Sequence, residues 1–184
     1  VTKGAKGISL GIFTRDMSLA TPTDPLTSGG LLHAITGTLT LVLCALILSV
    51  PIGILTALYL TEIRGRFTRP IRFLVQAMSG VPSIVAGLFI LSAVLYPITK
   101  QYSGFMGSLA LTILMIPTIA RTSEEVLKLI PNDLREAGVA LGGTQWRTVA
   151  MIVIPAARSG LVTAMILGIA RIAGETAPLL LLTG

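Results

Sequence analysis

The chain has 184 residues, of which 53% are hydrophobic and 12% are charged, and its mean hydropathy is +0.87. These values exclude an ordinary soluble domain and indicate a membrane protein. The formal net charge of +6 does not indicate nucleic-acid binding, because the basic residues are spaced between apolar segments. The single cysteine, Cys44, excludes an internal disulfide and a multi-cysteine metal cluster.

Four apolar runs are long enough to be helices that cross a membrane. Residues 1–30 are polar and contain no apolar core of a secretory signal, so insertion is expected to use the spans themselves. The spans are predicted at about 31–61, 71–97, 107–128 and 159–182. The second run contains Pro82, where a kink is expected.

The distribution of lysine and arginine predicts the topology. The linkers at 62–72 and 121–158 contain four and five basic residues, whereas residues 1–30 contain three and the short loop after the second span contains one. The positive-inside rule therefore places both linkers in the cytoplasm and residues 1–30 outside. Because the chain starts outside and without methionine, we expect a further span before Val1.

The cytoplasmic segment, about 129–150, is predicted to contain two helices. Asn132 is expected to cap a short helix over 133–141, which Gly142 and Gly143 end, and Thr144 is expected to cap the next one. One face of the first helix is small and apolar, and its members are Leu134, Ala137, Gly138 and Leu141. This pattern alone is typical either of an interfacial helix on the headgroups or of a docking surface for another protein.

The same segment carries a motif. Its residues are Glu136-Ala137-Gly138, then Gly142 after three residues, then Ile152-Val153-Ile154-Pro155 after nine more. This pattern resembles the cytoplasmic signature of the permeases of binding-protein-dependent ABC importers, from which Gly138 and Ile154 are conservative departures. The resemblance implies that this segment forms a coupling helix that docks the ATPase subunit through Glu136, Ala137, Gly138 and Gly142.

Further segments are similar to the A-type permease of the phosphate importers. These are Gly29-Gly30-Leu31-Leu32, Pro51-Ile52-Gly53-Ile54, the run from Gly80 to Phe89, Arg121-Thr122-Ser123-Glu124-Glu125, and Gly174-Glu175-Thr176-Ala177-Pro178. The resemblance implies an all-α, polytopic membrane protein of the ABC importer type I (MetI-like) class, with four visible spans of an expected six. The resemblance also implies that residues 1–184 form one permease domain of a multi-pass protein in a bacterial inner membrane.

The last span contains two charged residues, Arg171 and Glu175. A charged side chain near the membrane centre normally faces a protein interior or a water-filled path and pairs with another group. Arg171 is therefore predicted to attract a phosphate oxyanion, and Glu175 to occupy the guanidinium between cycles. The alternative is a structural ion pair that holds helices together. Small residues at helical spacing are predicted to continue this path, namely Gly160, Ala164 and Gly168.

The expected partners are implied by the resemblance. They are membrane lipid, a second permease subunit of the C type, a dimer of ATPase subunits and an extracytoplasmic phosphate-binding protein. The sequence has no Gly-x-x-x-x-Gly-Lys-Ser/Thr phosphate loop, no catalytic motif and no metal-ligand cluster. The chain is thus expected to be no enzyme and to bind no cofactor, with ATP used by the partner. Two alternatives stay open: a permease for phosphonate, sulfate or molybdate, and an ATP-independent carrier.

Overall fold

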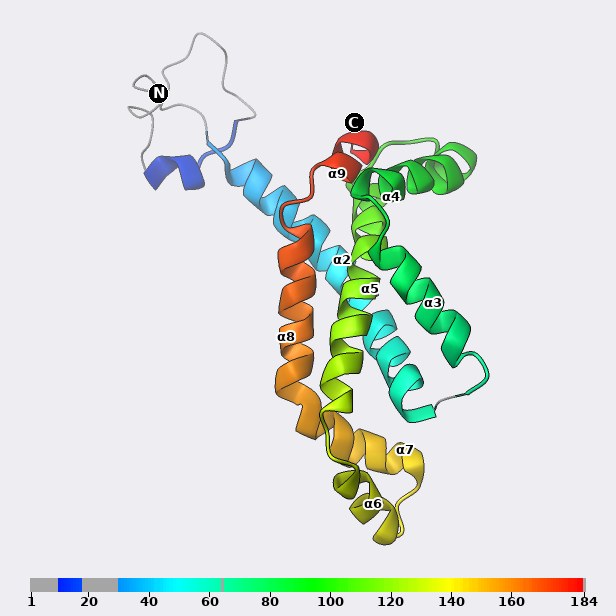
Figure 1. Ribbon diagram of the computed structural model, residues 1–184. Coiled ribbons are helices and arrows are strands. Elements are labelled where there is room, and N and C mark those ends of the chain that lie inside the picture. Colours follow the sequence, from blue (N-terminus) through cyan, green and yellow to red (C-terminus); the bar gives the residue numbers. More distant parts are fainter. Residues whose placement is uncertain (1–9, 18–29, 64, 184) are drawn as a thin grey trace. The chain divides into compact units, whose positions relative to one another are not determined.

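The computed structural model describes residues 10–17, 30–63 and 65–183 (Figure 1). The chain separates into two compact units, Val1–Leu41 and Val42–Gly184, which are described one after the other. In the first unit, a 3-10 helix η1 (Leu10–Phe13) precedes the start of α2 (Leu32–Leu58). The Leu31 N–H donates to the Ile12 carbonyl at 2.7 Å, and His33 Nδ1 lies 3.2 Å from Asp16 Oδ1.

In the described residues three helices are long and apolar enough to cross a membrane, judged by length and composition, and a bent pair would make a fourth span. The first is α2 with its π-helical extension η2 (Tyr59–Ile63), which together run from Leu32 to Ile63. The others are α5 (Gly104–Lys128) and the continuous helix Gln145–Ile172. The helices Leu32–Ile63 and Gly104–Lys128 lie close to the spans predicted at 31–61 and 107–128.

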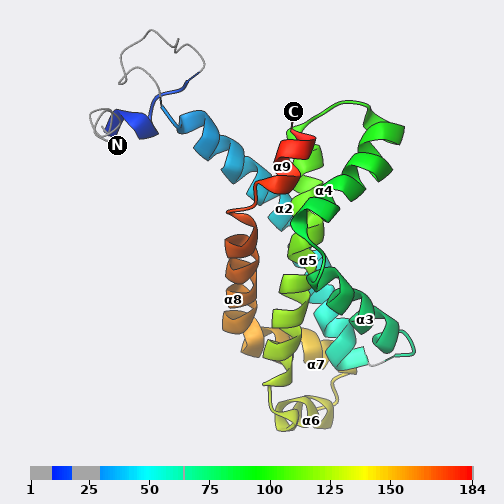
Figure 2. The same cartoon turned by 45° about the horizontal axis from the view of Figure 1, so that its top comes forward.

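The second apolar run forms the bent pair. It consists of α3 (Thr68–Ser79), then α4 (Ser83–Ile90) and the π-helical η3 (Leu91–Thr99), and the two arms meet at 107° (Figures 1 and 2). Pro82 accounts for the bend. It has no N–H to donate to a helical hydrogen bond, and in a continuous helix its ring would clash with the carbonyl four residues earlier. The kink expected within 71–97 is thus a sharp turn between two helices.

Helix α5 is the centre of the second unit. Its most apolar window is 61% buried, against 28% for each of the other two long helices. The helix begins at Ser103, whose Oγ accepts from the Met106 N–H at 3.4 Å. In both views α8 (Ile154–Ile172) lies on one side of α5 and α3 on the other (Figures 1 and 2).

Glycines let the neighbouring helices approach α5 closely. A Cβ on Gly53 of α2 would lie 2.8 Å from Ile119 Cγ2, and one on Gly168 of α8 would lie 2.9 Å from Ile119 Cγ1. At Gly160 the added atom would meet Val126 Cγ1 at 2.4 Å. Small residues at such positions allow backbones to pack at short range, which is how membrane helices commonly associate.

The last apolar run differs from the single helix predicted at 159–182. Helices α7 (Gln145–Thr148), η4 (Val149–Val153) and α8 are continuous, and α9 (Ala177–Leu182) follows after a break. The helix thus begins at Gln145, fourteen residues before the start of the predicted span, and ends at Ile172. The break arises because Pro178 lacks an N–H and its ring would clash with the Gly174 carbonyl in a continued helix.

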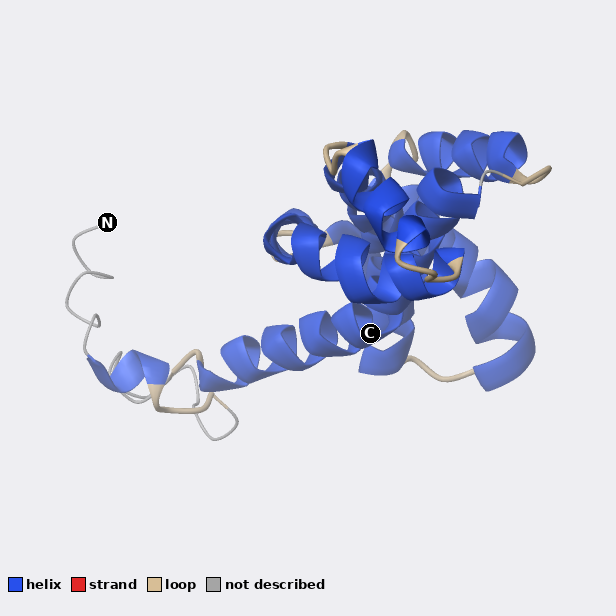
Figure 3. Ribbon diagram, turned by 90° about the horizontal axis from the view of Figure 1, so that it is seen from below, coloured by secondary structure: helices blue, strands red, loops and turns tan. Residues whose placement is uncertain are grey.

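Two buried apolar clusters stabilise the second unit. The first joins α2, α5, η4 and α8 through Ala57, Leu58, Leu127, Val149, Val153, Ala157 and Leu161. The second joins α4, η3, α5 and α9 through Ile90, Leu95, Met106, Ala110 and Leu182. All regular structure in the described residues is helical, as the view in Figure 3 shows. The predicted all-α fold class is confirmed for this part of the chain.

Candidate functional site

The predicted coupling segment contains the short helix α6 (Asn132–Ala140). Pro131 occupies the N-cap position, and its fixed φ of −58° suits the start of a helix. The prediction that Asn132 caps this helix was wrong, because Asn132 is its first residue and α6 has no side-chain cap. The Asn132 Oδ1 accepts instead from Arg135 Nη1 at 3.4 Å.

The end of α6 follows the glycine pattern of the sequence. Gly142 has a φ of +83°, which an L side chain adopts only at a cost. Its N–H donates to the Val139 carbonyl at 2.9 Å, and the Gly143 N–H donates to the Gly138 carbonyl at 3.1 Å. Both contacts satisfy carbonyls that the helix end would leave free. The predicted stop at Gly142 is confirmed.

The turn into α7 is also fixed by a cap. Thr144 Oγ1 accepts from the Arg147 N–H at 3.4 Å, so the predicted role of Thr144 as a helix cap is confirmed. Helices α6 and α7 are therefore joined by a turn with defined backbone geometry at both ends.

The four residues predicted to dock the ATPase do not share one environment. Glu136, Ala137 and Gly142 are exposed, whereas Gly138 is buried. A Cβ on Gly138 would lie 2.5 Å from Thr148 Cγ2, so Gly138 lets α6 pack against the chain's own α7. The close approach at Gly138 is thus a contact within the chain.

Exposed apolar side chains surround Glu136 and Ala137 on this segment. They are Leu134, Val139, Leu141 and Trp146, of which Leu141 is 87% exposed. A helix that leaves such side chains exposed beside a carboxylate has a surface suited to covering by another protein.

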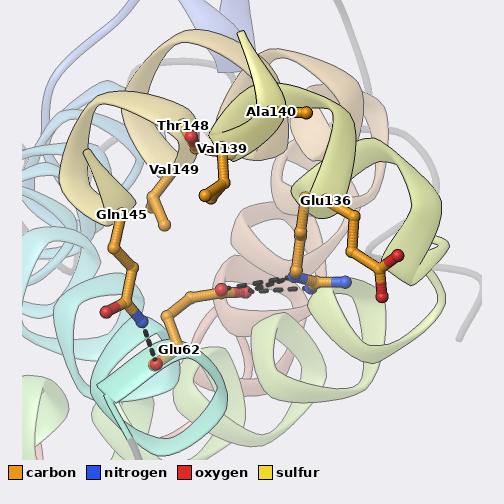
Figure 4. Close-up of a pocket in the computed structure, with 8 residues that line it drawn as sticks. Glu62, Glu136, Val139, Ala140, Gln145, Thr148 and Val149 are labelled. Carbon is orange, nitrogen blue, oxygen red and sulfur yellow. Dashed lines mark hydrogen bonds and ion pairs between the residues drawn. The ribbon is translucent and has the colours of Figure 1, made fainter. Parts of the chain in front are cut away.

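An ion pair ties α6 to the end of α2. Arg135 Nη2 lies 2.9 Å from Glu62 Oε1, and Arg135 Nε lies 3.2 Å from each carboxylate oxygen of Glu62. The Glu62 side chain is only 7% exposed. Gln145 Nε2 donates to the Glu62 backbone carbonyl at 2.7 Å, so α7 reaches the same residue. The dashed lines in Figure 4 mark these contacts.

A pocket of about 580 Å³ lies between these elements (Figure 4). Its lining residues come from η2, α6, α7 and η4, and they are Glu62, Arg135, Glu136, Val139, Ala140, Gln145, Thr148 and Val149. The Glu62–Arg135 ion pair forms one polar wall of this pocket.

A second charged cluster joins α3 to α5. Glu124 is 7% exposed, and its Oε1 accepts from Arg72 Nη2 at 2.8 Å and lies 2.7 Å from Lys128 Nζ. These three side chains line a small cavity of about 170 Å³, which Arg121 and Glu125 also line.

The two charged residues predicted for the substrate path lie at the break after α8. Arg171 is exposed in the last turn of this helix, and Glu175 is half-buried in the break, where its N–H donates to the Ile172 carbonyl at 3.1 Å. Among the described residues no ion pair within 4.0 Å includes either of them, so the pairing expected between them is not formed here.

The small residues of α8 do not continue that path. Gly160, Ala164 and Gly168 face α5, as the close approaches to Val126 and Ile119 show, and Ala164 is fully buried. The stripe that was predicted to line the path is instead a face for helix packing, because small side chains serve both purposes equally well.

The model of one protein family matches residues 49–184 of the chain, and that family is described as the binding-protein-dependent transport system inner membrane component. The chain belongs to this family. The predicted family is therefore confirmed, over a range that includes α3 to α9 and most of the apolar contacts described above.

Three relatives are 42–47% identical to the chain over the aligned residues. The chain is 47% identical over 158 residues to the "Phosphate transport system permease protein PstA 1" of Mycobacterium tuberculosis (strain ATCC 25618 / H37Rv), covering 85% of the chain and 51% of the relative. It is 45% identical over 183 residues to the PstA protein of Pasteurella multocida (strain Pm70), covering 98% and 63%. It is 42% identical over 182 residues to that of Haemophilus influenzae (strain ATCC 51907 / DSM 11121 / KW20 / Rd), covering 98% and 62%. The chain thus spans between 51% and 63% of the length of these relatives.

Solved structures show that the fold of this inner membrane component is that of MetI-like permeases. A chain of the MetNI methionine ABC transporter in an inward-facing conformation superposes with a TM-score of 0.66 at 22% identity, covering 79% of this chain and 68% of the other. A second crystal form gives a TM-score of 0.64 at 23% identity, with the same coverage. At this identity the likeness shows the fold alone.

Sequence reasoning missed two ion pairs of the described residues in which the carboxylate is buried. Glu62 and Arg135 lie 73 residues apart, and Arg72 and Glu124 lie 52 apart. Glu62, Arg72 and Glu124 are charged residues near the ends of apolar runs, and Arg135 lies in the cytoplasmic segment between two such runs. Charge at a helix end is typical of a solvated linker, so the pattern did not distinguish the pairs from ordinary topology signals.

Proposed function

We propose that the chain is the transmembrane permease subunit of an ATP-driven importer of inorganic phosphate. The observation that carries this proposal is the 42–47% identity to phosphate transport permease proteins over 85–98% of the chain. The family description, a component of binding-protein-dependent transport, supports an importer that receives its substrate from a separate binding protein.

In this proposal the exposed residues of the coupling segment dock an ATPase subunit. Glu136 and Ala137 of α6 and Gly142 at its end lie on the surface beside the exposed side chains of Leu134 and Leu141. Gly138 contributes indirectly, because it fixes α6 against Thr148. The remaining partners are a second permease subunit, which completes the translocation path, and an extracytoplasmic phosphate-binding protein. ATP binds to the ATPase dimer, and this chain contributes half of the path in a bacterial inner membrane.

Arg171 and Glu175 are the proposed path residues. An exposed guanidinium without an ion-pair partner in the described part of the chain is free to hold an oxyanion through charge-assisted hydrogen bonds. Both residues adjoin the break between α8 and α9, and broken helices in transporters commonly border the substrate site. Glu175 would compete with phosphate for Arg171 and so keep binding weak enough for release.

The test is ATP-dependent phosphate uptake into vesicles that contain the full-length protein with its partner subunits. We expect Arg171→Ala to lower uptake roughly tenfold or more, the loss typical of a hydrogen bond to a charged group. Arg171→Lys keeps the charge and should retain part of the uptake. Arg158→Ala, which removes an exposed arginine from the same helix, is the matched control and should leave uptake unchanged.

Three results would contradict parts of this proposal. Uptake that is unchanged in a fully assembled Arg171→Ala complex would remove Arg171 from the path. Uptake of labelled phosphate can be competed with unlabelled anions. If sulfate, molybdate or phosphonate abolished it at lower concentrations than unlabelled phosphate does, the substrate would be that oxyanion. Uptake that persists without the ATPase would indicate an ATP-independent carrier.

A further inference from the structure

The guanidinium of Arg135 has no unused donor. Arginine has five N–H groups, and here Nε and Nη2 hold the Glu62 carboxylate. The second N–H of Nη2 donates to the Leu127 carbonyl at 2.9 Å. Nη1 donates to the Ile130 carbonyl at 2.7 Å and to Asn132 Oδ1 at 3.4 Å. One side chain of α6 therefore binds both the end of η2 and the end of α5.

Arg135 donates hydrogen bonds to carbonyls at the end of α5. The last carbonyls of a helix have no partner within the helix and need one from elsewhere. Arg135 donates to the Leu127 carbonyl, which also accepts from the Ile130 N–H at 3.4 Å, and to the carbonyl of Ile130, which follows the helix. The chain connection between α5 and α6 is thus reinforced by hydrogen bonds that a flexible linker would lack.

The contact to Glu62 joins segments that the chain does not connect directly. The backbone of α6 lies beside α7 and η4, and the long Arg135 side chain extends from it to η2. Glu62 is 7% exposed and Arg135 is 22% exposed, so this pair is largely removed from water. Separating the two groups would leave a buried charge without its partner, which is strongly unfavourable. Movement of α6 away from η2 is therefore opposed.

We propose that Glu62 and Arg135 form a positioning pair through which movement of α6 is transmitted to the cytoplasmic ends of α2 and α5. The inference rests on the proposed function, in which an ATPase moves α6. Neither residue touches the substrate. Their task is to make α6, η2 and the end of α5 move as one body, so that a displacement at the docking surface reaches two spans at once.

The test uses two mild substitutions and a matched control in the full complex in vesicles. Glu62→Gln removes the charge but keeps the shape, and Arg135→Lys keeps the charge but loses the fork geometry. The control is Glu124→Gln, whose side chain is 9% exposed against 7% for Glu62, and which removes the carboxylate that pairs with Arg72 of α3 and with Lys128 while leaving α6 untouched. Two quantities are measured: the phosphate transported per ATP hydrolysed, and hydrogen exchange of the α6 amides.

We expect both variants of the pair to assemble and to hydrolyse ATP. The phosphate moved per ATP should fall by roughly fivefold or more, which is the size of a typical coupling between two sites. Exchange of the α6 amides should be faster in these two variants and unchanged in Glu124→Gln. A purely structural role would lower assembly and transport together without changing their ratio to ATP hydrolysis.

An unchanged ratio of phosphate to ATP in Glu62→Gln would overturn the proposal, whatever Arg135→Lys does. If Arg135→Lys fails to assemble, Glu62→Gln alone decides. If the unaltered complex moves no phosphate, the proposed function fails, and the positioning pair is then judged by exchange. Faster α6 exchange in both variants but not in Glu124→Gln supports the pair, and equal exchange in all of them overturns it.

Discussion

Single glycines decide how α6 is held. Gly138 has Thr148 and Ile152 so close that an added Cβ would lie 2.5 Å and 2.8 Å from their side chains. Gly142 has open space around it but a φ of +83°. The two residues are thus required for different reasons, the first for lack of room and the second for backbone conformation.

Gly138→Ala should therefore overpack the contact between α6 and α7. We expect the unfolding free energy to fall by about 1 to 3 kcal/mol, as for other extra methyl groups in tight packing. The measurement is the thermal midpoint of the purified complex together with recovery of the ATPase on the permease. Gly37→Ala, in α2, adds the same methyl group where no atom lies within 4 Å, and should not lower the midpoint. Equal midpoints for both variants would contradict the packing argument.

At Gly142 the expected order of variants differs. Alanine in the left-handed region costs about 1 to 2 kcal/mol, whereas asparagine adopts this conformation more readily. Gly142→Ala should thus destabilise the complex more than Gly142→Asn does, although asparagine is the larger residue. Chemical denaturation in detergent measures both. A larger loss for asparagine would show that contacts of Gly142 with a partner, rather than its φ, govern this position.

At the scale of elements, the small face of α8 gives the α5–α8 pair its close packing. Gly168→Val should force α8 away from Ile119 and Met115, both within 2.9 Å of an added Cβ. We expect a lower yield of folded protein and a lower thermal midpoint. Ile166→Ala changes an exposed residue of the same helix and is the control. If both variants were equally stable, the face would not be a packing surface.

The elements also show which features the sequence could predict. Apolar length located α2 and α5, Pro82 marked the bend, and Thr144 and Gly142 marked helix ends, because each of these signals is local. The continuity of the helix that Thr144 caps with the last span was missed, because residues 145–158 look like part of a polar linker. The Gly160–Gly168 face was misread since a small-residue face has the same spacing whether it borders a helix or a path. Glu62 and Arg135 meet only through the fold, so no local pattern pairs them.

At the scale of the whole molecule, the charge distribution predicts the orientation in the membrane. Cys44 is the single thiol among these 184 residues, and Cys44→Ser removes it from the background for single-cysteine labelling. Leu141→Cys, at a position 87% exposed, should react with an impermeant maleimide only after right-side-out vesicles are opened. Tyr102→Cys, at a position 55% exposed, should react in intact vesicles. The opposite pattern would invert the topology and place α6 away from a cytoplasmic ATPase.

The central place of α5 has a consequence for the order in which the chain is made. Synthesis runs from the N-terminus, so Gly53 and Arg72 leave the ribosome before their partners Ile119 and Glu124 exist. Gly87 packs closely against Pro178, since a Cβ on Gly87 would lie 2.9 Å from Pro178 Cα. This contact can form only after Pro178 has been made, which is later still. Helices α2 and α3 are therefore made before their final neighbours, and the second unit closes around α5 only after α9 has been made.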